Sequence, residues 1–215
     1  MKTLEARIAE YEEVKKQKVP SDVLTIMAQA TEELKSGGID DNSLKTGDIA
    51  PEFSLPNHKG DVCSLSALLD ESVVVLNFYR GGWCPYCNLE LNSLQQILPE
   101  IEARGATLVA ISPEQPDKSL STREKNELAF DVLYDQGNKV AEAFGLVFNL
   151  PESLRSIYET FGIDIPGYNG DDTYSLPIPA TYIIGQNGQI LYHFVDPDYT
   201  KRLESALIIE QLSRP

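Results

Sequence analysis

The sequence has only three cysteines in 215 residues, and an odd count with no visible export signal argues against a framework of structural disulfides. Long apolar runs are absent as well, since none approaches the roughly 20 residues that cross a bilayer. The first residues, Met1 to Arg7, already carry alternating charges rather than a long apolar stretch. We therefore expect a soluble, cytoplasmic protein that has no membrane partner.

Basic residues are also scarce. Lysine and arginine total 18 against 33 acidic residues, which gives a formal charge of −15. Such a charge repels phosphate backbones, so nucleic acid is not an expected partner. Two interpretations of the acidity stay open, which are solubility and an acidic docking surface for a basic partner.

The first 43 residues are predicted to form a helical extension. Leu4, Ile8, Tyr11 and Val14 recur at helical spacing as far as Pro20, and a second stripe follows until two glycines end it. These apolar faces suit packing against the core or against a second copy, so a homodimer is one expectation. Residues 44–215 are predicted to form one further domain.

That second part alternates short β-branched runs with helical stretches, which is typical of an α/β domain. The predicted fold class is a thioredoxin-like fold, with a central mixed sheet flanked by helices. Expected strands cover residues 73–79, 107–111, 132–134 and 181–184, a hairpin strand covers 189–194, and helices cover 85–104 and 200–212. The stretch 145–179, rich in proline and glycine, is predicted to be an insertion over one edge or the rim of the site.

Two of the cysteines, Cys84 and Cys87, stand three residues apart at the start of the predicted helix 85–104. This spacing brings two sulfurs close to disulfide distance with little backbone movement. A helix N-terminus also stabilises a thiolate and lowers its pKa. Arg80, four residues earlier, either adds positive charge to this site or is a solvated loop residue.

Zinc binding and a purely structural role are the competing interpretations of this cysteine pair. A structural zinc site needs about four ligands, and the other candidates, Cys63, His58 and His193, are isolated in the sequence. We therefore expect neither a metal nor a cofactor. Cys63 is interpreted as a small buried apolar residue. Pro179 is either a cis-proline facing the cysteines or a proline at a strand edge.

From about Lys45 onward the chain resembles the peroxiredoxin superfamily, in particular the alkyl hydroperoxide reductase C and thiol-specific antioxidant group. The resemblance rests on residues 46–56, on 64–69 and above all on Asn77-Phe78-Tyr79-Arg80-Gly81-Gly82-Trp83-Cys84-Pro85-Tyr86-Cys87. Peroxiredoxins carry Phe-Tyr followed by PxxxTxxC, whose last cysteine attacks the peroxide. Counted from Phe78, Cys87 falls on that peroxidatic position and Cys84 falls on the threonine.

The chain departs from the family pattern at three places. Arg80 stands where the family has proline, Cys84 where it has threonine, and Pro179 near the family's peroxide-activating arginine. The resemblance implies a thiol peroxidase in which Cys87 reacts with hydrogen peroxide or an organic hydroperoxide, Cys84 closes a disulfide, and thioredoxin or another dithiol reduces it.

Two other functions stay in competition with the peroxidase. In a thiol–disulfide oxidoreductase the roles are exchanged, so that Cys84 attacks a disulfide and Cys87 resolves the product. In a binding protein the fold is kept without turnover. The candidate catalytic residues are Cys87, Cys84 and Arg80 in each catalytic reading.

Overall fold

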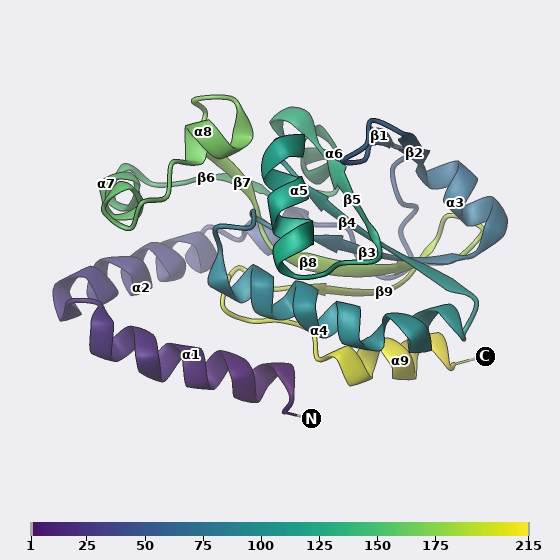
Figure 1. Ribbon diagram of the computed structural model, residues 1–215, viewed down its shortest axis with the longest axis horizontal. Coiled ribbons are helices and arrows are strands. Elements are labelled where there is room, and N and C mark those ends of the chain that lie inside the picture. Colours follow the sequence, from purple (N-terminus) through teal and green to yellow (C-terminus); the bar gives the residue numbers. More distant parts are fainter. Residues whose placement is uncertain (1, 215) are drawn as a thin grey trace.

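A computed structural model describes residues 2–214 and shows a central five-stranded sheet with helices on both faces (Figure 1). The strand order is β5-β4-β3-β8-β9. Strands β3, β4 and β5 are parallel, whereas β8 runs antiparallel to both β3 and β9, so the sheet is mixed as predicted. The strand bounds are β3 Val73–Phe78, β4 Ala106–Ser112, β5 Asp131–Tyr134, β8 Ala180–Ile184 and β9 Ile190–Val195.

The central strand β3 is buried on both faces because nearly every residue in it is apolar. Val74, Leu76 and Phe78 face one core, which α3 (Leu65–Glu71) and α6 (Lys139–Ala143) cover. Val75 faces the second core, which α4 (Pro85–Glu102) and α9 (Ser205–Leu212) cover. Figure 1 shows α4 and α9 side by side beneath the sheet, and the two helices are in contact. The remaining helix of this region is α5, Pro116–Lys125.

Helix α4 follows directly from its sequence. Cys84 is the N-cap and Pro85 takes the first helical position, where a missing N–H has no cost. The stripe of apolar residues predicted for this helix is buried against the sheet: Cys87, Leu91, Leu94, Leu98 and Ile101. The predicted helix is thus confirmed, and it carries Cys87 on its core face.

The N-terminal segment forms two helices, α1 (Leu4–Lys18) and α2 (Ser21–Ser36), as predicted. Helix α1 runs alongside α4 (Figure 1) and packs against the core under that helix through Ile8 and Tyr11. Helix α2 packs against α7 (Glu152–Thr160), with Met27 and Ala30 in the contact. Part of each apolar stripe therefore packs within the chain, whereas Val14 and Ile26 are exposed. The division between residues 43 and 44, and a homodimer, stay predictions.

The predicted insertion, residues 145–179, is ordered into β6 (Val147–Asn149), α7, α8 (Ile165–Asn169) and β7 (Ser175–Pro177). Strands β6 and β7 pair with each other in an antiparallel ribbon outside the main sheet. The ribbon and the two helices share a small core with α2. A second ribbon, β1 (Ser54–Pro56) with β2 (Val62–Ser64), lies near the start of the domain, and short 3-10 helices cover Ile39–Asn42 and Gln136–Asn138.

The last helix begins five residues later than predicted, at Ser205 rather than Thr200. The Asp198 carboxylate accepts hydrogen bonds from the backbone N–H and the hydroxyl of Thr200, and this turn replaces the first helical turn. Residues 201–204 have no regular secondary structure, and the Arg202 side chain of this segment lies in the interior. Within residues 2–214, every helix is too short or too polar to cross a bilayer.

Candidate active site

The site begins where β3 ends, in a tight loop that leads into α4. Gly81 has φ of +150°, a conformation that L side chains rarely adopt. Gly82 is required for space, because a Cβ there would lie 1.7 Å from the Thr122 Oγ1 atom of α5. The Gly82 N–H donates a 3.0 Å hydrogen bond to Glu114, which also accepts from Thr122 at 3.1 Å. These contacts fix the loop and thereby the start of α4.

Cys84 stands at the mouth of α4 and lines a cavity of about 290 Å³. Only 1% of the residue is exposed. Burial acts to raise the pKa of the Cys84 thiol, but the hydrogen bond with Cys87 and the charges of Arg80 and Arg202 outweigh it and lower the pKa to about 6. These charges therefore favour the thiolate form of Cys84, and Cys84 lines the cavity that a small molecule can enter.

Cys87 lies one turn further along α4 and is fully buried. Burial raises the pKa of its thiol well above the ordinary value, and the hydrogen bond and negative charge of Cys84 add to this effect. The Arg202 Nη2 atom lies 3.4 Å from the Cys87 sulfur and favours the opposite direction. Cys87 is thus a neutral thiol next to a cation that can stabilise it when it is deprotonated.

Arg202 is held in place by a buried ion pair with Glu90. The Arg202 Nε atom lies 2.5 Å from Glu90 Oε2, and the two side chains are 1% and 4% exposed. The other Glu90 oxygen accepts a 3.1 Å hydrogen bond from the Asn77 amide of β3, which also contacts Thr181 of β8. Burial raises the pKa of Glu90 to about 7, although Arg202 acts against this. The network connects the sheet, α4 and the C-terminal segment behind Cys87.

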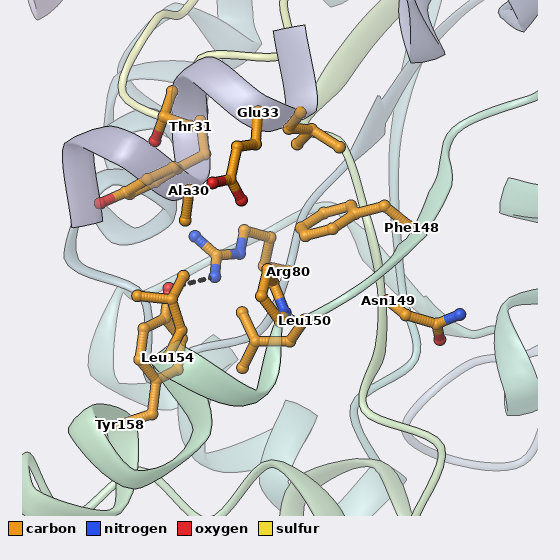
Figure 2. Close-up of a pocket in the computed structure, with 12 residues that line it drawn as sticks. Ala30, Thr31, Glu33, Arg80, Phe148, Asn149, Leu150, Leu154 and Tyr158 are labelled. Carbon is orange, nitrogen blue, oxygen red and sulfur yellow. Dashed lines mark hydrogen bonds between the residues drawn. The ribbon is translucent and has the colours of Figure 1, made fainter. Parts of the chain in front are cut away.

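Arg80, at the end of β3, is buried rather than solvated, with 1% of its surface exposed. Its Nη2 atom donates a 2.6 Å hydrogen bond to the Tyr158 hydroxyl of α7, drawn as the dashed line in Figure 2. The guanidinium also lies within 4.7–5.6 Å of the ring centres of Trp83, Tyr158 and Tyr199. Its positive charge acts on Cys84 and contributes to the lowered pKa of that thiol. Arg80 is therefore not a solvated loop residue, and its catalytic role stays a prediction.

The other residues singled out in the sequence lie elsewhere. Cys63, on β2, is half-buried against the core on the opposite face of the sheet from Cys84 and Cys87. His58 contacts Arg123, and His193 contacts Thr46. No three side chains of His, Cys, Asp or Glu gather as metal ligands anywhere within residues 2–214. Pro179 follows a trans peptide bond and precedes β8, so the cis-proline alternative was wrong.

Comparison with known proteins agrees with this arrangement. The sequence model of the AhpC/TSA family matches residues 46–193. This chain belongs to that family. Peroxiredoxin Bcp of Escherichia coli K12 is 35% identical to it over 105 residues, which are 49% of this chain and 67% of Bcp. The putative peroxiredoxin Rv2521 of Mycobacterium tuberculosis is 32% identical over 102 residues, which are 47% of this chain and 64% of that protein.

Three solved structures have the same fold as this chain. The peroxidoxin BcpB of Mycobacterium tuberculosis superposes with a TM-score of 0.62 at 23% identity, over 79% of this chain and 96% of that one. A peroxiredoxin-like protein of Aquifex aeolicus has the same TM-score at 18% identity, over 79% and 86%. A putative thiol:disulfide interchange protein DsbE of Chlorobium tepidum has a TM-score of 0.52 at 23% identity, over 80% and 100%. The predicted thioredoxin-like fold and the family resemblance are therefore confirmed.

Arg202 and Glu90 are the site residues that sequence reasoning missed. Arg202 lies beyond residues 46–193, outside the part of the chain that the AhpC/TSA family model matches. Its side chain reaches a sulfur that is 115 positions away in the sequence. Glu90 carried one usable signal, since it stands three residues after Cys87 and therefore lies on the same side of α4.

Proposed function

We propose that this chain is a thiol peroxidase that reduces a hydroperoxide through a dithiol–disulfide cycle between Cys84 and Cys87. The observation that carries the proposal is the unequal environment of the two sulfurs. Cys84 lines the cavity and has a pKa lowered to about 6, whereas Cys87 is enclosed and has a raised pKa. The membership in the AhpC/TSA family and the relatives named peroxiredoxin support the reaction class.

The environment favours Cys84 as the attacking sulfur, although the family motif aligns Cys87 with the cysteine that attacks the peroxide. The Cys84 thiolate attacks the outer oxygen of the peroxide, the O–O bond breaks, and an alcohol or water leaves after taking up a proton. This step leaves Cys84 as a sulfenic acid. The Cys87 thiol then attacks the Cys84 sulfur, which forms the disulfide and releases water.

Two cations support these steps. Arg80 stabilises the Cys84 thiolate before the attack, and Arg202 stabilises negative charge on Cys87 when that thiol reacts. Arg202 thus places a guanidinium from the C-terminal segment beside Cys87, whereas Pro179 stands near the position of the family's peroxide-activating arginine. A thiol reductant, with thioredoxin or another dithiol as the family expectation, returns both sulfurs to the reduced state. A cytoplasmic location also stays a proposal.

Single serine variants test the assignment. Because Cys84 attacks first, Cys84→Ser abolishes peroxide consumption and forms no sulfenic acid that dimedone can trap. Cys87→Ser still reacts once, and its Cys84 sulfenic acid accumulates because no thiol resolves it. Mass spectrometry after dimedone labelling locates the modified sulfur. Trapped sulfenic acid on Cys87 in the Cys84→Ser protein would instead assign the attack to Cys87.

A second candidate function is a thiol–disulfide oxidoreductase, because the same Cys84 thiolate can attack a disulfide. A coupled assay with a small disulfide substrate and with hydroperoxide separates the two reactions. The peroxidase proposal requires that the second-order rate constant with hydroperoxide exceed that of free cysteine. Turnover of disulfides alone favours the oxidoreductase, and turnover of neither substrate favours a binding protein.

A further inference from the structure

The two N-terminal helices close a cavity over Cys84. Tyr11 and Lys15 come from α1, and Met27 comes from α2. These helices lie before residue 46, where the match to the AhpC/TSA family begins. Aromatic side chains supply much of the remaining lining, among them Trp83, Tyr86, Tyr158 and Tyr199. At about 290 Å³ the cavity has room for a small organic molecule.

The charged residues that line this cavity directly are both cations. Its lining includes two cations, Lys15 and Arg80, and no acidic residue, although the chain as a whole has a formal charge of −15. Lys15 shares its charge with Glu12, 3.4 Å away on the same helix, and also contacts the Tyr86 hydroxyl. The aromatic walls and the cations together suit a ligand that has an apolar body and an anionic group.

Of the two cations, Arg80 is the one whose positive charge has no ion-pair partner among the described residues. Within residues 2–214 no carboxylate lies within ion-pair distance of its guanidinium, and its Nε atom has no hydrogen-bond partner. The side chain also borders a second cavity of about 90 Å³ between α2 and α7, and Figure 2 shows the guanidinium among lining residues that include one carboxylate, that of the exposed Glu33. A buried cation without a direct ion-pair partner is costly, so additional negative charge next to it is favoured.

The Cys84 thiolate supplies that negative charge only in the reduced protein. When Cys84 and Cys87 form a disulfide, the negative charge on Cys84 disappears while Arg80 keeps its positive charge. An anion that enters the cavity then takes over the role of the thiolate. Anion affinity is therefore coupled to the redox state of the cysteine pair.

We propose that this cavity binds a small thiol that carries a carboxylate, and that it does so in the disulfide form of the protein, where the thiol acts as the reductant. The proposal rests on the dithiol–disulfide cycle proposed above. The thiolate of the bound molecule attacks the Cys84 sulfur, the S–S bond breaks, and Cys87 leaves as a thiolate beside Arg202. A second thiol molecule attacks the mixed disulfide, which releases a small-molecule disulfide and the Cys84 thiolate.

The burial of Cys84 favours a small reductant over a protein. Only 1% of Cys84 is exposed, and the cavity above it is walled by α1, α2 and the segment around Tyr158 and Phe161. A protein dithiol has to displace Tyr11 and Lys15 before its sulfur reaches Cys84. A molecule that fits 290 Å³ enters without that rearrangement.

A binding experiment tests the coupling without any turnover. Trp83 lines the cavity and is the only tryptophan of the chain, so its fluorescence reports ligand binding there. The probe is benzoate, and benzamide is its neutral control. At pH 7.5 benzoate binds the disulfide form about tenfold more tightly than the dithiol form, whereas benzamide shows no preference. Equal benzoate affinity for both forms overturns the proposal.

A pair of lysine variants shows whether the cavity itself holds the anion. Lys15→Met weakens benzoate binding to the disulfide form several-fold. Lys18→Met removes the same charge from the end of the same helix, at an exposed position outside the cavity lining, and leaves benzoate affinity unchanged. An identical loss in both variants would mean that only the overall charge of α1 matters, and it would overturn the proposed site.

Reduction rates identify the source of the anion. The disulfide form is mixed with 3-mercaptopropionate, with 2-mercaptoethanol or with thioredoxin, and rates are compared per thiolate. The proposal predicts that 3-mercaptopropionate reacts about tenfold faster than 2-mercaptoethanol, and that Lys15→Met reduces this ratio towards one. Reduction by thioredoxin without preference between the two small thiols overturns it. Benzoate that binds the dithiol form and competes with hydroperoxide also overturns it, since the ligand is then the substrate.

The binding test and the peroxidase assay fail independently. If no hydroperoxide is consumed but benzoate still prefers the disulfide form, the proposed function is wrong and the anion site stands. If hydroperoxide is consumed but benzoate shows no redox preference, the anion site is wrong and the peroxidase stands.

Discussion

Cys84 and Cys87 lie one helical turn apart, yet the two ends of this turn differ in almost every physical respect. The Cys84 end opens into an aromatic cavity with Arg80 and Lys15. The Cys87 end is enclosed between α4 and the sheet, beside the Glu90–Arg202 ion pair. The short motif therefore does not determine which of its two cysteines attacks and which resolves. The charges that surround each sulfur come from segments far away in the sequence.

The arginines beside the two sulfurs, Arg202 and Arg80, also differ in their surroundings. Arg202 has a carboxylate partner in the interior, whereas Arg80 has aromatic rings, one tyrosine hydroxyl and the Cys84 sulfur around it. The positive charge of Arg202 is therefore paired with Glu90 whether the cysteines are reduced or form a disulfide. Arg80 has no ion-pair partner in the described part of the chain, so loss of the Cys84 thiolate removes negative charge that acts on it.

The largest effect is expected at the enclosed end. Arg202→Met leaves Glu90 buried without its cation, and breaking such a pair lowers the free energy of unfolding by about 3–5 kcal/mol. Urea unfolding of the reduced protein at pH 8 measures this loss. The double variant Arg202→Met/Glu90→Gln removes the unpaired charge as well and recovers part of it. Equal stability of wild type and Arg202→Met would show that the ion pair does not hold the Cys87 end together.

A smaller effect on the free energy of unfolding, with a defined pH dependence, is expected at Glu114, which binds the loop before Cys84. Burial raises the pKa of Glu114 to about 7, although hydrogen bonds from Gly82 and Thr122 act against it. The unfolded chain loses this proton near pH ~4.3, so the folded state binds more protons between about pH 4 and 7 and loses stability as the pH rises through that window. Above about pH 7 Glu114 is ionised in both states, and this loss of stability reaches its full size.

Glu114→Gln removes this titration because the amide stays neutral. Its stability relative to wild type should therefore increase from pH 5 to pH 8, by about 1–3 kcal/mol. Chemical denaturation at several pH values measures the difference between the two proteins. A difference that does not change with pH would mean that Glu114 titrates normally and that the loop tolerates its charge.

The smallest effect is expected at the third cysteine. Cys63 is half-buried on the opposite face of the sheet from the other two. Cys63→Ser should change the free energy of unfolding by less than about 1 kcal/mol and leave the rate of peroxide consumption unchanged. Steady-state assays with hydroperoxide check the second point. A loss of turnover would bring Cys63 into the thiol cycle and end the two-cysteine comparison.

The elements that sequence reasoning predicted well are those with strong local patterns. The apolar run of β3, the stripe of α4 and the hairpin of β8 and β9 each follow from residues that are close together in the chain. The last helix was predicted too long: Leu203 stands four residues before Leu207 and continues the apolar spacing of the helix into residues 201–204, which have no regular secondary structure. The turn at Asp198 determines the true start.

The site could be predicted only in part. The pattern of Cys84 and Cys87 at a helix N-terminus was visible, and so was the presence of Arg80 nearby. The burial of Arg80 depends on α2 and on Tyr158 of α7, and the position of Arg202 depends on an irregular segment near the C-terminus. No local pattern encodes such long-range contacts, so the electrostatic difference between the two sulfurs became visible only in the folded chain.

The most direct test of this account is the identity of the thiolate at neutral pH. Reduced wild-type protein is alkylated briefly with iodoacetamide across pH 5 to 8, and mass spectrometry reports how fast each cysteine reacts. Cys84 is expected to react first. Its alkylation rate should rise with pH, and the midpoint of this rise should lie near the pKa of about 6. Faster labelling of Cys87, or a Cys84 midpoint near the ordinary thiol value of roughly 8.5, would contradict it.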